Sequence, residues 1–96
     1  MCGIIGINSN KPVSVSIINS LKKLEYRGYD SAGIATLSSG SINEVKSEGR
    51  VDKLEKNSLV QNMEGTIGIG HVRWATHGLP NSINAHPHSS QNVSVV

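Results

Sequence analysis

Apolar and polar positions along this chain change their spacing several times, and each spacing predicts a different element. Residues 3–7 form a short apolar run whose β-branched isoleucines suit a buried strand better than a helix of that length. Apolar residues then recur at helical spacing within 13–26, with lysine and glutamate on the other side, which predicts an amphipathic helix. The chain therefore opens with a strand followed by a helix.

The middle of the chain continues this mixed pattern. It predicts a strand over 32–37, a turn over 38–41, a hairpin partner over 42–47, a second helix over about 51–59, and a strand over 66–72. In the last of these, Gly68 and Gly70 alternate with isoleucines, so one face of the strand has no side chains. This predicts the close approach of another layer or of a ligand.

The C-terminal part is different. Residues 73–92 show no regular periodicity, and loops of this length are typically functional or disordered. Residues 93–96 then have a strand pattern at the very end of the chain. Because a domain rarely stops inside a core strand, we expect a truncated chain, with 1–96 amounting to at most one domain.

Charge and cysteine content exclude several classes of partner. Nine Lys and Arg against seven Asp and Glu give a net charge of +2, and the basic residues are scattered in ones and twos. No stripe is dense enough to follow a phosphate backbone, so we expect no nucleic-acid partner. One cysteine forms no internal disulfide, and no apolar run approaches the roughly 18–20 residues of a membrane span. We expect a cytoplasmic protein that does not enter membranes.

Cys2 is the only cysteine, and it directly follows the initiator methionine. Removal of Met1, which a small second side chain permits, leaves a thiol and a free α-amine on one residue. Their ordinary pKa values, about 8.5 and about 7.7–8.0, make proton transfer between them easy near neutral pH, so the residue combines a nucleophile with a base. The alternative is a small buried side chain at the start of a strand, since free cysteine is often buried. The N-terminal residues alone leave both interpretations open.

Arg73 leaves the last long strand and enters a polar loop, where it is well placed to bind a carboxylate through two parallel N–H donors. A surface ion pair is the alternative. Thr76 and His77 offer hydroxyl and ring contacts to the same small ligand, or only satisfy the turn. Arg27 and Asp30 lie three residues apart, and we expect them to pair with each other.

The four histidines, His71, His77, His86 and His88, raise the question of zinc, because imidazole is a common zinc ligand. His86 and His88 flank a proline in an extended segment and are expected to point to opposite faces. No helical pair of histidines with a glutamate exists either. We therefore predict no metal site, and a small histidine-rich metal-binding module is the alternative hypothesis.

Four strings occur in a fixed order: MCGIIGI from residue 1, LEYRGYDSAGIA from residue 24, GHVRWATHG from residue 70 and NAHPH from residue 84. Together they resemble the glutamine amidotransferase domain of the glutamine--fructose-6-phosphate aminotransferase (isomerizing) family, the glucosamine-6-phosphate synthases. The resemblance runs from residue 2 to the end of the chain and is least characteristic over 38–64. Other amidotransferases with an N-terminal cysteine share the first string, but generally lack the EYRGYDS and RWATHG strings together.

The resemblance implies a class II amidotransferase that hydrolyses glutamine and needs no cofactor. Cys2 is implied to attack the side-chain amide, with its α-amine as general base and then as acid toward departing ammonia. Arg73 is implied to hold the α-carboxylate of glutamine, with Thr76 and His77 completing that side of the pocket. Supporting roles in loop closure, ammonia gating and the surroundings of the nucleophile are implied for Gly78, Trp74, His86 and Arg27.

The family also implies a fold and partners. The fold class is α+β: an αββα sandwich of antiparallel sheets of the N-terminal-nucleophile hydrolase type, truncated here, with exposed apolar sheet surface. Ammonia from glutamine converts fructose 6-phosphate to glucosamine 6-phosphate, and the sugar site and most of the homodimer interface are implied to lie in an absent isomerase half. The oxyanion-stabilising Asn–Gly pair of the family falls beyond residue 96, so we expect the piece alone to be inactive. The alternatives are an inactive remnant of the enzyme or another amidotransferase with an N-terminal cysteine.

Overall fold

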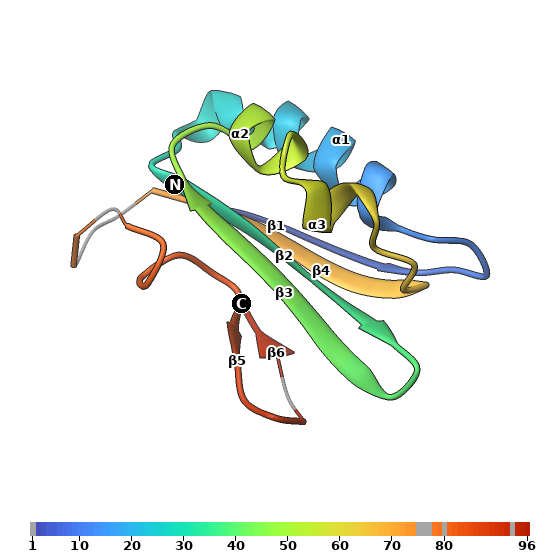
Figure 1. Ribbon diagram of the computed structural model, residues 1–96. Helices are drawn as coiled ribbons and strands as arrows, with labels where there is room; N and C mark the ends of the chain where they lie inside the picture. The colour runs from blue at the N-terminus through green and yellow to red at the C-terminus, as the bar shows by residue number, and fades with distance from the viewer. Residues whose placement is uncertain (1, 75–77, 80, 93) are drawn as a thin grey trace.

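A computed structural model describes residues 2–74, 78–79, 81–92 and 94–96 (Figure 1). Its elements, in chain order, are β1 (Gly3–Asn8), α1 (Ser14–Leu24), η1 (Glu25–Arg27), β2 (Ser31–Ser38), β3 (Ser41–Glu48), α2 (Val51–Glu55), α3 (Ser58–Gln61), β4 (Ile67–Arg73), β5 (His88–Ser89) and β6 (Ser94–Val95). Among the residues described, no helix is both long enough and apolar enough to cross a membrane.

The main sheet has four antiparallel strands in the order β1-β4-β2-β3. Strands β2 and β3 form the predicted hairpin, and its two connecting residues, Ser39 and Gly40, have φ values of 50° and 76°. Positive φ at both positions matches the twist of a tight hairpin, where glycine and small polar residues are preferred. Strand β4 lies inside the sheet, between β1 and β2.

The helices cover one face of this sheet (Figure 1). Ile17, Ile18 and Leu21 of α1 are at most 2% exposed, and they pack with residues of α2, β2 and β4 in a single hydrophobic core. The predicted amphipathic face of the first helix is thus confirmed. The helix is shorter than predicted, since it ends at Leu24 and continues as the single 3-10 turn η1.

The bare glycine face of β4 lies against α1, as the sequence pattern predicted. A Cβ atom added to Gly68 would lie 2.7 Å from Ile17 Cδ1, and one added to Gly70 would lie 2.5 Å from Ile17 Cγ2. Real Cβ atoms do not approach other carbons so closely, so both positions require glycine for the helix to sit where it does.

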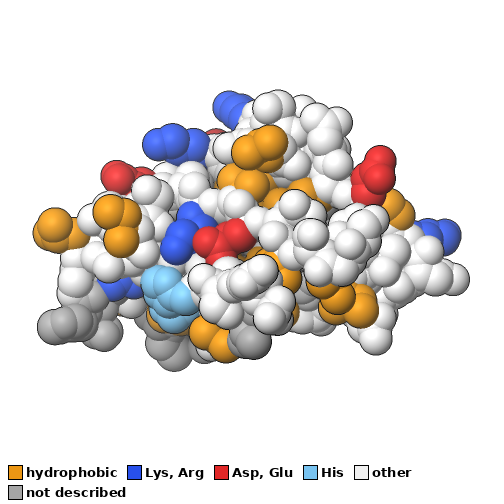
Figure 2. Space-filling model, turned by 60° about the horizontal axis from the view of Figure 1, so that its bottom comes forward, with side chains coloured by type: hydrophobic (Ala, Val, Ile, Leu, Met, Phe, Trp, Pro, Cys, Tyr) orange, Lys and Arg blue, Asp and Glu red, His pale blue; other side chains and the backbone are white. Residues whose placement is uncertain are grey.

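The opposite face of the sheet is only partly covered. The two-stranded sheet of β5 and β6 lies on this side (Figure 1). Strand alternation directs Ile4, Leu37 and Ile67 to the same side, and these residues are 58%, 40% and 44% exposed. Apolar surface is visible between polar groups in the view that brings the lower side forward (Figure 2). The expectation of exposed apolar sheet surface is confirmed.

One predicted element is wrong in extent. The helix expected over 51–59 is two short helices, because α2 ends at Glu55 and α3 begins at Ser58. Asn57 separates them: its side chain accepts a hydrogen bond from the Leu59 N–H at 2.9 Å and caps α3. This local hydrogen bond competes with continuation of the first helix.

Candidate active site

Cys2 lies directly before β1 and is exposed, so the interpretation of Cys2 as a small buried residue is wrong. Its Sγ accepts a long hydrogen bond from the Trp74 N–H at 3.5 Å and lies 3.9 Å from the Trp74 carbonyl oxygen. Because Gly3 pairs with Val72, the thiol is brought to the C-terminal end of β4. Met1 lies outside the described residues.

Arg73 is the last residue of β4, and it is buried, with 8% of its surface exposed. Its Nη1 donates a hydrogen bond to the Leu79 carbonyl oxygen at 3.0 Å and lies 3.9 Å from Asp30 Oδ1. The alternative of a surface ion pair is therefore wrong, since both side chains are shielded from solvent. Because Cys2 Sγ contacts the backbone of Trp74, the residue after Arg73, the thiol and the guanidinium belong to the same end of the sheet, where a small anionic molecule can be bound near a nucleophile.

The loop after β4 supplies the other predicted residues. Trp74 is half exposed, and its ring lies against Gly28, where an added Cβ would be 3.0 Å from the ring carbons. Gly28 has a φ of 114°, which also favours glycine. Gly78 is exposed and lies near Arg73, because its added Cβ would be 3.5 Å from Nη2. Thr76 and His77, predicted to contact the ligand, lie outside the described residues.

Asp30 was not predicted to be near Arg73. The sequence interpretation paired Asp30 with Arg27, and that pairing stays a prediction because the Arg27 side chain lies outside what the structure describes. The structure brings the Asp30 carboxylate to Arg73 and the Asp30 N–H to the Arg73 carbonyl oxygen at 2.7 Å. The feature that could have revealed this contact is the strand β2, which begins at Ser31, because Ser31 pairs with Arg73 of β4. Only the backbone of Arg27, in η1, is described.

Three of the histidines gather beside this site. The rings of His71 and His86 stack with centroids 4.4 Å apart, and those of His86 and His88 meet edge to face at 4.5 Å. The expectation that His86 and His88 point to opposite faces is wrong, because His86 lies in a bend before β5, where strand alternation does not apply. Burial, followed by the positive charge His86 would carry, lowers the pKa of His71 from 6.5 to about 4. Burial also lowers the pKa of His86.

These rings touch face to face or edge to face, and they do not form a ligand set. Within the ranges that the structure describes, no three His, Cys, Asp or Glu side chains are arranged to hold a metal ion. The Nδ1 atoms of His71 and His86 are buried and have no hydrogen-bond partner among the residues that the structure describes. A neutral imidazole tolerates this better than a charged one, which agrees with the lowered pKa values.

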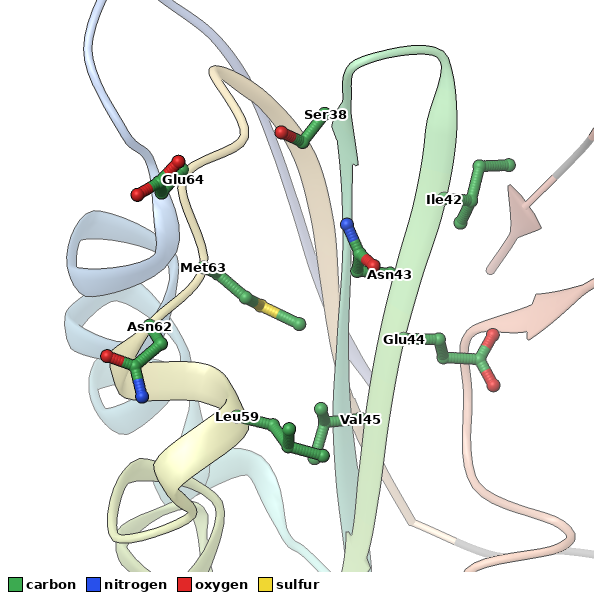
Figure 3. Close-up of a pocket in the computed structure, with 9 residues that line it drawn as sticks. All are labelled: Ser38, Ile42, Asn43, Glu44, Val45, Leu59, Asn62, Met63 and Glu64. Atoms are coloured by element: carbon green, nitrogen blue, oxygen red, sulfur yellow. The ribbon is translucent and has the colours of Figure 1, made fainter.

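A surface groove lies away from Cys2. A groove of about 420 Å³ separates α3 from the β2–β3 hairpin (Figure 3). Met63 and Val45 point into it from its two sides, whereas Glu44 points away, toward the segment of β5, where it accepts a hydrogen bond from Ser89. No candidate active-site residue that the structure describes lines this groove. The groove and the thiol are therefore at separate places in the fold.

Comparisons with known proteins identify relatives over the whole chain. No family model matches it. The chain is 52% identical over 96 residues to the glutamine--fructose-6-phosphate aminotransferase (isomerizing) of Mesorhizobium japonicum, and 53% identical to that of Brucella abortus. In both comparisons all of this chain is covered, and it spans 16% of the length of the relative.

Solved structures show the same fold. The structure is similar to glutamine phosphoribosylpyrophosphate amidotransferase from B. subtilis, with a TM-score of 0.78 and 26% identity over 98% of this chain and 20% of that chain. It is also similar to the allosteric regulatory enzyme of purine biosynthesis, with a TM-score of 0.79 and 26% identity over 92% of this chain and 19% of that chain.

The predicted fold class and resemblance are both confirmed by these likenesses. Helices, an antiparallel sheet and the start of a second sheet succeed one another, as in an α+β sandwich, and the structural neighbours are N-terminal-nucleophile amidotransferases. Identity of about one residue in two over the whole chain is high enough to assign a family. The chain therefore belongs to the glutamine--fructose-6-phosphate aminotransferase family, and corresponds to a segment of the glutamine amidotransferase domain of its members.

Proposed function

We propose that this chain carries the glutamine-hydrolysing nucleophile of an enzyme that converts fructose 6-phosphate to glucosamine 6-phosphate. The observation that supports it most directly is the exposed Cys2 thiol just before β1, which contacts the backbone of the residue that follows the buried Arg73 at the end of β4. The names of the relatives supply the substrates. Residues 1–96 are assigned to the N-terminal part of the glutaminase domain.

The chemistry begins once Met1 has been removed. The α-amine of Cys2 takes the thiol proton, directly or through one water, and the sulfur attacks the side-chain carbonyl carbon of glutamine. The protonated amine then gives its proton to the leaving nitrogen, so that ammonia departs and a γ-glutamyl thioester remains. Water hydrolyses the thioester, which releases glutamate and restores the thiol.

The remaining residues are assigned to binding and closure. Arg73 holds the α-carboxylate of glutamine, with Thr76 and His77 on the same side, while the loop to Gly78 closes over the substrate. Trp74 gates the ammonia path, and its contact with Gly28 supports a position beside the thiol. His86 and Arg27 are assigned indirect roles, in supporting the surroundings of the nucleophile.

The second half of the reaction is assigned to other parts of the protein. The chain spans 16% of the length of its relatives, so we place the fructose 6-phosphate site and the homodimer interface in the rest of that length. Residues 1–96 by themselves are then not expected to catalyse turnover of glutamine. A single free cysteine suits the reducing cytoplasm, which we propose as the location.

The test is mass spectrometry of the intact chain after incubation with 6-diazo-5-oxonorleucine, a glutamine-like electrophile. The expected result is a chain without Met1 that carries one adduct at Cys2. Excess L-glutamine should prevent the labelling, because it occupies the pocket, whereas D-glutamine should not. A Cys2→Ala variant should take no label, and in the full-length protein it should lose glutamine hydrolysis.

Two results would contradict the proposal. Labelling that L-glutamine does not reduce would show an ordinary exposed thiol without a pocket. Retained Met1 in the full-length protein with normal glutamine hydrolysis would exclude the α-amine as the base. If the full-length protein is active and residues 1–96 show no protected labelling, the chain is an incomplete piece of the site.

A further inference from the structure

Asp30 lies at the edge of the main sheet where β3 and β4 end and β2 begins. Its N–H donates to the Arg73 carbonyl oxygen at 2.7 Å, at the end of β4, and its carbonyl oxygen accepts from the Gly49 N–H at 2.8 Å, just after β3. Ser31, the next residue, begins β2. The backbone of Asp30 is therefore fixed on both sides, and its side chain has a defined direction.

The carboxylate of Asp30 is equally constrained. Its Oδ1 accepts a hydrogen bond from Ser31 Oγ at 2.9 Å and lies 3.9 Å from Arg73 Nη1. The Arg73 and Asp30 side chains are 10% and 15% exposed, the most shielded of the ion pairs in the part of the chain that the structure describes. A guanidinium removed from water needs a nearby negative charge, and Asp30 supplies it.

A second acceptor acts on the same nitrogen. Arg73 Nη1 also donates to the Leu79 carbonyl oxygen at 3.0 Å, so a carboxylate and a carbonyl hold one corner of the guanidinium. The group is planar and rigid, and it carries five N–H donors in fixed directions. Holding one nitrogen in this way therefore fixes the plane in which the other donors meet a ligand.

We propose that Asp30 is a positioning residue for substrate binding: it holds the guanidinium of Arg73 in the plane that receives the α-carboxylate of glutamine. This inference rests on the proposed function, in which Arg73 binds that carboxylate. Asp30 itself does not touch glutamine or the reacting sulfur. Its effect passes through Arg73 and concerns substrate binding more than the attack by Cys2.

The test is the kinetics of glutamine hydrolysis by the full-length protein. Asp30→Asn keeps the shape of the side chain and removes its charge, so we expect the KM for glutamine to rise about 10-fold, with kcat within about 3-fold of the wild type. Asp52→Asn makes the same change on an exposed side chain of α2 and should leave both constants unchanged. Thermal melts followed by circular dichroism check that each variant is folded.

A double-mutant cycle separates positioning from a general effect on the fold. In an Arg73→Lys background the planar group is absent, so Asp30→Asn should change the KM by less than about 2-fold. If Asp30→Asn does not fold, Ser31→Ala decides, because it removes only the hydroxyl that fixes Oδ1 and should raise KM in the same direction.

Three results have distinct meanings. An unchanged or lower KM in Asp30→Asn, or in Ser31→Ala where that variant decides, overturns the positioning role. An equal rise in KM in the wild-type and Arg73→Lys backgrounds also overturns it, because the effect then does not pass through Arg73. If Arg73→Lys alone leaves the KM at its wild-type value, the proposed function of Arg73 has failed, and the positioning role fails with it.

Discussion

Acidification should destabilise this protein through His71, and the effect can be isolated by one substitution. His71 is 4% exposed, its ring stacks on His86, and its buried Nδ1 has no hydrogen-bond partner in the described part of the chain. Burial and the neighbouring histidine lower its pKa from 6.5 to about 4. The folded state therefore prefers the neutral ring, whereas the unfolded chain takes up a proton near pH 6.5.

The sign and size of the effect follow from proton linkage. Between pH 6.5 and about 4 the unfolded state binds more protons than the folded state, so the free energy of unfolding rises with pH. The contribution of His71 is fully present above pH 6.5 and is lost as pH falls toward 4. At about 1.4 kcal/mol per pH unit, the whole window amounts to about 3 kcal/mol, and the interval from pH 6.0 to 4.5 to about 2 kcal/mol. Such a loss is a large part of the stability of a small domain.

The assay is urea unfolding at several pH values, followed by far-ultraviolet circular dichroism. His71→Gln removes the titrating ring and leaves all other titrating groups in place, so the variant serves as the control for their shared effect. We expect the wild type to lose about 2 kcal/mol more than His71→Gln between pH 6.0 and 4.5. Equal losses in the two proteins would refute the reasoning, because they would show that His71 takes up its proton as easily in the folded state as in the unfolded state.

Two further predictions concern glycines that hold the site in place. Gly33→Ala should cost about 1–3 kcal/mol of folding free energy and raise amide exchange in β5 and β6, because its Cβ would overlap the His86 carbonyl oxygen. Gly6→Ala, whose added Cβ has its nearest contact at 3.9 Å, is the control and should change little. Gly28→Ala adds a Cβ at positive φ and 3.0 Å from the Trp74 ring. We therefore expect a loss of about 1–3 kcal/mol in the free energy of unfolding and a shifted tryptophan fluorescence spectrum. An unchanged spectrum would contradict the contact between Gly28 and the Trp74 ring.

Local patterns predicted most of the elements. The spacing of Ile17, Ile18 and Leu21 identified the buried face of α1, and the alternation around Gly68 and Gly70 identified the strand face on which the helix packs. These signals are strong because they repeat at the period of the element itself. A single side-chain hydrogen bond, such as the one that caps α3, leaves no such pattern, and the break between α2 and α3 was therefore missed.

The site was only partly predictable. Cys2 and Arg73 stand out in the sequence as a second-position cysteine and as an arginine at a strand end. The position of Asp30 depends on the pairing of β4 with β2. The position of His86 depends on the packing of its backbone against Gly33. Both depend on strand order and layer packing, which the residues around Asp30 and His86 do not encode.

The inner place of β4 has a consequence for the order in which the site assembles. The Cys2 thiol and the Trp74 backbone that contacts it are 72 residues apart in the chain. Translation proceeds from the N-terminus, so the cysteine leaves the ribosome long before Trp74, and β1 waits for β4, the strand beside it in the main sheet. Pairing over such a separation is among the slower steps of folding. A nascent chain therefore carries an ordinary thiol until most of the sheet has been synthesised, and its nucleophile is among the first residues made and among the last to be placed.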